Sequence, residues 1–212
     1  PRLDTQQRLR LRRLKMAIAS YIMWVSIGVG AMVVGQLDID RAILHFVLGG
    51  IVVTNLYFYV MIRTGLNQRL SDPSMTFQQI LVALCWAMVL MATTDEARGA
   101  MLPVYIITIL FGVFGLTPRA FVRLAFFALV SYGAVIGIEY SRSPAEFDLR
   151  QEALRSTVLA ASLIWCTLFG SYVTQLKEAL KSHNNELKEK VSNTSREASR
   201  DHLTQTFNRR YM

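Results

Sequence analysis

Long apolar segments alternate with short charged ones along most of the chain. Six of these segments are candidates for membrane-spanning helices, at residues 16–35, 42–62, 76–94, 100–117, 124–138 and 156–173. A spanning helix needs about 20 predominantly apolar residues. The first three segments are close to that length, and the other three are shorter but uncharged. The pattern therefore predicts an all-α, polytopic membrane protein with six transmembrane helices.

After residue 173 the apolar pattern gives way to a heptad. Apolar residues recur at Val173, Leu180 and Leu187, and the positions four later include Asn184 and Val191. Such spacing predicts a parallel coiled coil over 174–199, in which a buried Asn favours one register. The alternative is a single solvated helix linking two domains. Because no proline follows Pro144, we expect one nearly continuous helix from residue 144 to 199, roughly 80 Å long.

Three helix starts are predicted from a capping side chain that precedes a proline, at Asp72–Pro73, Thr117–Pro118 and Ser143–Pro144. The third also has Glu146 in the position of a capping box. Helices are therefore expected to begin at each of these prolines. In the segment 124–138, Gly133 and Gly137 form a small-residue motif that packs helices either within one subunit or between two.

The net charge of +8 is unevenly distributed along the chain. The N-terminus, the 63–75 and 117–123 loops and the tail hold 18 Lys and Arg against 7 Asp and Glu, whereas the remaining loops hold 5 against 8. This asymmetry follows the positive-inside rule, so both termini are expected in the cytoplasm and nucleic acid is not an expected partner. The basic segment 1–15 is expected either to contact anionic lipid headgroups or only to fix orientation. It does not resemble a cleavable signal peptide.

Polar and aromatic side chains inside the apolar segments are the candidates for a ligand site. Polar groups within a membrane usually face the bundle interior, which is expected of His45 and Asn55. The candidate lining of a pocket for a small apolar or amphipathic ligand is His45, Asn55, Trp86, Tyr105, Tyr132 and Tyr140. The alternative is that these residues only pack. No second histidine lies in a predicted span, so neither a bis-histidine haem site nor a metal site is predicted.

The last residues follow the pattern Asp-x-Leu-Thr, three residues, Asn-Arg-Arg. The matching positions are Asp201, Leu203, Thr204, Asn208, Arg209 and Arg210. This pattern resembles the opening of the GGDEF domain, the catalytic domain of bacterial diguanylate cyclases. That family usually has Gly-Leu after the threonine, where this chain has Gln205–Thr206. In the family the metal-binding aspartate, the guanine contacts and the GG(D/E)EF signature lie further downstream, so no catalytic residue is assigned here.

The resemblance implies a domain order of a cytoplasmic basic segment (1–15), a six-helix membrane sensor and anchor (16–173), a linker helix (174–199) and the start of a GGDEF domain (200–212). The parent protein would be a homodimer in the bacterial inner membrane. It would condense two GTP into cyclic di-GMP with Mg²⁺, while this part of the chain would bind no cofactor. A small six-span transporter or channel, and a receptor with a different output domain, are the alternatives.

Overall fold

The computed structural model describes residues 5–35, 37–94, 98–145 and 147–199 of the chain. These residues form helices and connections, with no strand among them. The helices are α1 (Thr5–Val33), α2 (Arg41–Thr64), η1 (Leu66–Arg69), α3 (Thr76–Met91), α4 (Arg98–Leu110), η2 (Phe111–Phe114), α5 (Pro118–Arg142) and α6 (Leu149–Ser199). The all-α fold class is therefore confirmed.

Four of the helices, α1, α2, α5 and α6, are long and apolar enough to cross a membrane. The other two predicted segments also form helices, but α3 has 16 residues and α4 has 13. At 1.5 Å per residue these two are about 24 and 20 Å long, shorter than the ~30 Å hydrocarbon core of a bilayer. Each predicted apolar segment thus has most of its residues in one α-helix, although the segment 100–117 continues past α4 into η2. The two shortest α-helices, α3 and α4, are adjacent in the chain.

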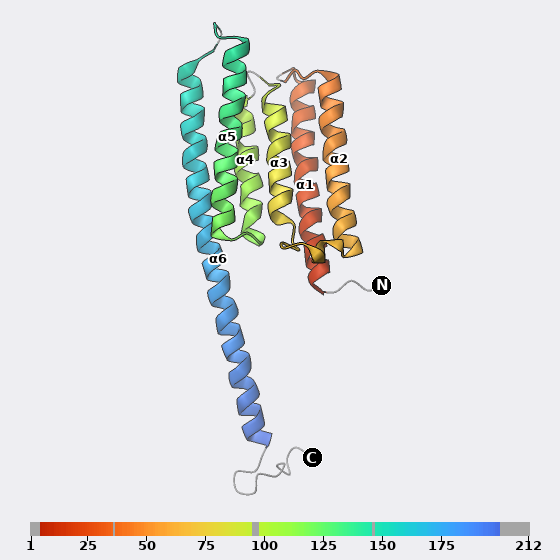
Figure 1. The fold of residues 1–212 in the computed structure, drawn as a ribbon, viewed down its shortest axis with the longest axis vertical. Coiled ribbons are helices and arrows are strands. Elements are labelled where there is room, and N and C mark those ends of the chain that lie inside the picture. Colours follow the sequence, from red (N-terminus) through yellow and green to blue (C-terminus); the bar gives the residue numbers. More distant parts are fainter. Residues whose placement is uncertain (1–4, 36, 95–97, 146, 200–212) are drawn as a thin grey trace. The chain divides into compact units, whose positions relative to one another are not determined.

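The chain divides into two units, residues 1–171 and 172–212. In the first unit, α1 packs on α2, and α3 packs on α2, α4 and α5 (Figure 1). A large apolar core joins α3, α4, α5 and the first part of α6 around Leu84, Tyr105, Phe121 and Leu159. A second, smaller core of Leu14, Phe58, Ile62 and Met75 joins α1 and α2 to the turn before α3.

Only one of the three predicted helix starts is correct. Thr117 accepts a hydrogen bond from the backbone N–H of Ala120, and Pro118 is the first residue of α5. Asp72 instead accepts from the backbone N–H and hydroxyl of Ser74, at 2.9 and 2.5 Å. Its side chain therefore closes a turn, and α3 begins later, at Thr76.

The predicted long helix is continuous as expected, but it begins five residues later than Pro144. Ser143 ends α5, where its backbone N–H donates to the carbonyl of Glu139. The N-terminal turn of α6 is capped by Asp148, whose carboxylate accepts from the backbone N–H groups of Arg150 and Gln151. From Leu149 the helix continues for 51 residues to Ser199. Glu146, expected in the capping box, lies outside the described residues.

The basic N-terminal segment is continuous with the first apolar helix, because α1 runs from Thr5 to Val33 without a break. Its Gln7 is 2% exposed and Asn67 of η1 is fully buried. Gln7 donates to the side-chain oxygen of Asn67 at 2.8 Å, and Asn67 donates to the carbonyl of Pro73 at 2.6 Å. These bonds fix the start of α1 to the connection between α2 and α3.

Candidate functional site

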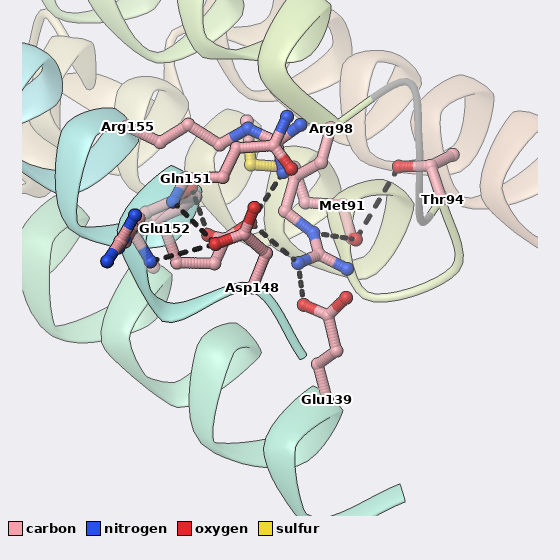
Figure 2. A network of polar contacts seen from close by, with 10 residues as sticks. Met91, Thr94, Arg98, Glu139, Asp148, Gln151, Glu152 and Arg155 are labelled. Carbon is pink, nitrogen blue, oxygen red and sulfur yellow. Dashed lines mark hydrogen bonds and ion pairs between the residues drawn. The ribbon is translucent and has the colours of Figure 1, made fainter. Parts of the chain in front are cut away.

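A network of charged side chains, with Arg98 and Glu152 buried at its centre, joins the ends of α4, α5 and α6 (Figure 2). Arg98 is the first residue of α4, Tyr132 and Glu139 lie on α5, and Glu152 and Arg155 lie on the first turns of α6. All five belong to the first unit of the chain. Side chains from three helices thus meet at one end of the bundle.

Arg98 is the basic centre of the network and is only 1% exposed. Its guanidinium forms ion pairs with Glu139 and with Glu152, the latter at 3.4 Å. Its Nε also donates to the carbonyl of Met91, in the last turn of α3, at 3.4 Å. One side chain therefore contacts α3, α5 and α6 from the start of α4.

Glu152 is the acidic centre of the network and is 5% exposed. Its Oε1 accepts from Arg98 at 3.4 Å and from Arg155 at 2.5 Å. Its Oε2 accepts from the hydroxyl of Tyr132 at 2.9 Å. The carboxylate thus has partners on both oxygens, which is the condition under which a buried charge is tolerated.

A glycine at the second position of α4 lets Arg155 reach this carboxylate. A Cβ added at Gly99 would lie 3.3 Å from Nε of Arg155, closer than ordinary van der Waals contact. The guanidinium of Arg155 therefore lies directly against the backbone of α4, between α4 and its own helix. An alanine at position 99 would require the guanidinium of Arg155 to shift by a few tenths of an ångström.

The network is electrically balanced, with two guanidinium groups facing two carboxylates. Removing a charge from water costs several kcal/mol per ion, so such a group is stable only when its partners are held in place. The arrangement joins α6 to the bundle through directional bonds in addition to apolar packing. Among the described residues there is no cluster of His, Cys, Asp or Glu that could hold a metal ion, and the geometry of the network is that of a structural contact between helices.

A second feature of the bundle is an apolar cavity of about 230 Å³ between α1, α2, α3 and α4. Trp24, Asn55 and Trp86 are among its lining residues. The indole N–H of Trp86 donates to the hydroxyl of Thr54 at 3.4 Å, which holds the ring between α2 and α3. The amide nitrogen of Asn55 donates to the carbonyl of Ile51, one turn earlier in α2.

The structure does not bring the six predicted ligand-site residues together. Asn55 and Trp86 line the apolar cavity, whereas Tyr105 lies in the large core and contacts the hydroxyl of Ser131. Tyr132 belongs to the charged network. Tyr140 is 57% exposed, with its ring edge-on to that of Phe147.

The expected inward orientation of His45 is wrong. Its side chain is exposed on α2, and its Nδ1 contacts the carbonyl of Arg41, four residues earlier. A polar side chain on an apolar helix can satisfy its hydrogen-bonding capacity in this way, by bonding to the backbone of its own helix. A ligand site common to His45 and the cavity residues is therefore not formed.

The predicted pairing residues lie on the part of α6 that belongs to the second unit. Leu180, Leu187 and Val191 are 68, 60 and 68% exposed. Val173 is half-buried and Asn184 is exposed. Pairing through these side chains stays a prediction. The residues of the GGDEF-like pattern, 201–210, lie outside the described residues.

The sequence pattern did not identify Arg98, Glu139, Glu152 and Arg155 as site residues. Each lies at the border of an apolar segment, where charged residues are normally solvated, and they entered the prediction only as loop charges. A usable signal was present in the i, i+3 spacing of Glu152 and Arg155 beside an apolar run. Burial of a charged pair depends on which helices meet, and that information is absent from local spacing.

No family model, curated protein or solved structure matches this chain.

Proposed function

We propose that this chain is the membrane sensor and anchor module of a dimeric diguanylate cyclase. Its six helices would cross the bacterial inner membrane, with both termini in the cytoplasm. The module would supply anchoring, dimerisation and regulation, and a GGDEF domain beginning near residue 201 would supply the chemistry. That domain would hold GTP and Mg²⁺, and two such domains must face each other to join two GTP.

The observation that carries this proposal is the continuity of α6. The helix begins beside the buried network, contributes Leu159, Leu163 and Cys166 to the large core, and continues to Ser199. The GGDEF-like pattern starts at Asp201, two residues after the helix ends. A helix is stiff over this length, so a shift or rotation of its first turns would be carried to the output domain.

The exposed face of α6 supports a dimer. Trp165 and Phe169 are exposed and stack on each other with ring centroids 5.1 Å apart. Exposed apolar residues then continue along the helix at Leu168, Tyr172, Leu176, Leu180, Leu187 and Val191. A second copy of α6 would bury this row, as in a parallel coiled coil.

The small-residue motif on α5 offers a further contact between copies. A Cβ added at Gly133 or Gly137 would meet nothing within 4 Å, so neither glycine packs against another helix of the same chain. This open surface is available for packing between subunits, which is the alternative that we propose for the motif. Phe126 and Val130, exposed on the same helix, would extend such a contact.

Cysteine crosslinking in the full-length protein tests the proposal. Leu180→Cys and Leu187→Cys should each give disulfide-linked dimers in membranes. Ser182→Cys and Glu189→Cys, two residues further on and hence about 200° around the helix, are the matched controls and should not. Cyclic di-GMP should be measured in the same cells.

Two results would refute the proposal. The first is the absence of interchain disulfides at positions 180 and 187 while activity is retained. The second is a full-length protein that makes no cyclic di-GMP from GTP in any variant or condition, because the output assigned here would then be wrong.

A further inference from the structure

The apolar cavity extends along almost the whole length of the first four helices. On α1 its lining residues run from Arg13 to Met32, a distance of about 28 Å at 1.5 Å per residue. On α3 they run from Thr76 to Met91, the first and last residues of that helix. The cavity therefore spans nearly the thickness of a bilayer's hydrocarbon core, which is about 30 Å.

The cavity is narrow for its length. A compact cavity of about 150 Å³ is enough to hold a benzene ring. Here about 230 Å³ is distributed over the full height of the bundle. Apart from a few hydroxyl and amide groups, its walls are apolar, with Ile51, Ile80 and Val104 among them. Such a shape fits a single extended hydrocarbon chain better than a ring system or a two-chain lipid.

A positive charge lies at one end of the cavity. Arg13 is part of its lining, near the start of α1. Its guanidinium approaches the connection between α4 and α5, since a Cβ added at Gly115 would lie 3.4 Å from Nη1. Within the described ranges no carboxylate forms an ion pair with Arg13. The end of the cavity is thus complementary to an anion.

We infer that this cavity binds a fatty acid, with the acyl chain between α1 and α3 and the carboxylate at Arg13. The inference deepens the proposed function and rests on it for one point, namely that the bound molecule is what the module senses. A fatty acid would reach the site from the bilayer, because most of the lining residues belong to the apolar helices α1 to α4. Arg13 supplies the selectivity, since an uncharged alcohol of the same chain length lacks its charge partner.

The test is photolabelling of the full chain in phosphatidylcholine vesicles. The probe is a long-chain fatty acid that carries a diazirine near its methyl end, and the labelled positions are mapped by peptide mass spectrometry. We expect labels on the cavity-lining faces of α1, α3 and α4. Competition should be about fivefold stronger with the unlabelled fatty acid than with the matching alcohol, the effect of one basic residue at a membrane surface.

Two pairs of variants assign the effect to the cavity. Ala83 lines the cavity, and Ala83→Phe should abolish the labelling. Ala19→Phe, at an exposed position of α1 outside the lining, should leave it unchanged. Arg13→Gln should remove the preference for the acid over the alcohol, whereas Arg12→Gln, at an exposed position that is not part of the lining, should preserve it.

Labelling spread evenly over the outer faces of the helices would overturn the inference. Equal competition by phosphatidylglycerol and the fatty acid would also do so, because the site would then accept a two-chain lipid. An unchanged preference for the acid in Arg13→Gln would remove the assigned role of Arg13. Photolabelling measures binding and does not depend on cyclic di-GMP production. A negative labelling result would therefore overturn the fatty-acid site alone, whereas absent linker crosslinks would overturn the proposed function.

Discussion

At the residue scale, Glu152 is the side chain on which most of the interhelical bonding of α6 depends. It accepts hydrogen bonds from Arg98 on α4 and Tyr132 on α5, and from Arg155 on its own helix. Loss of its charge would leave two guanidinium groups with one remaining carboxylate, that of Glu139. The cost of such a change is mainly that of an uncompensated positive charge in the network, because Arg98 would retain Glu139 whereas Arg155 would lose its carboxylate.

Glu152→Gln is therefore expected to destabilise the bundle by about 3–5 kcal/mol, the usual effect of removing one partner of a buried ion pair. Arg150→Gln, two residues away and exposed, is the matched control and should change stability by less than about 0.5 kcal/mol. The free energy of unfolding in detergent micelles is the measurement. Equal stability of the two variants would show that the network contributes nothing.

Close packing at Gly170 gives a second prediction at this scale. A Cβ at this position would lie 2.5 Å from Cζ of Phe121, whose side chain is fully buried. Gly170→Ala should therefore destabilise the bundle by about 1–3 kcal/mol through overpacking. Gly133→Ala, where a Cβ meets nothing, should stabilise the isolated subunit by up to about 1 kcal/mol. Thermal unfolding of the two variants would distinguish them, and a stabilising Gly170→Ala would contradict this contact.

At the scale of the elements, α6 combines two kinds of surface. Its first part contributes to the large core and to the charged network, and its last part carries exposed leucines at heptad spacing. The polar Asn184 interrupts that apolar row. A polar residue in a coiled-coil interface lowers the stability of the pair of helices while favouring one register. A weakly paired interface is suited to switching between two packings.

Asn184→Leu should accordingly strengthen pairing of the linker and reduce the response of the parent protein to its stimulus. Ser182→Leu, on the opposite face of the same turn, should alter neither. Disulfide yield at Leu180→Cys and the change in cyclic di-GMP on stimulation are the two measurements. Weaker pairing in Asn184→Leu would contradict the placement of this residue in the coiled-coil interface.

How far these elements could be predicted depends on which interactions decide them. The apolar runs located all six helices, because burial or lipid contact along one helix is a local property of the sequence. The starts at Pro73 and Pro144 were wrong because Asp72 bonds within a turn, and because Asp148 rather than Ser143 caps α6. The network around Arg98 was missed because it depends on contacts between helices that are distant in the chain.

At the scale of the whole molecule, the proposal requires six crossings with both termini on one side. Four helices are long and apolar enough to cross alone, and α3 and α4 are shorter than a typical bilayer core. Short helices are accommodated by local thinning of the bilayer at modest cost. The charge asymmetry of the loops predicts that the end of the bundle with Ser141 lies outside and the end with Gln68 lies in the cytoplasm.

Cysteine accessibility in intact cells tests this topology. Ser141→Cys at the end of α5 and Gln68→Cys in η1 are both at exposed positions. A membrane-impermeant thiol reagent should label position 141 from outside and position 68 only after the membrane is permeabilised. Labelling of position 68 in intact cells would show that the orientation is wrong.

The central claim is that α6 transmits the state of the bundle to the output domain. The most direct measurement compares crosslinking of the linker when the charged network is intact and when it is altered. In the full-length protein, the rates of disulfide formation at Leu180→Cys and Leu187→Cys are compared in three backgrounds, namely the unaltered chain, Glu152→Gln and Arg150→Gln. The account predicts altered crosslinking rates and altered cyclic di-GMP output in Glu152→Gln only. Identical rates in all three backgrounds, with folded protein in each, would contradict it.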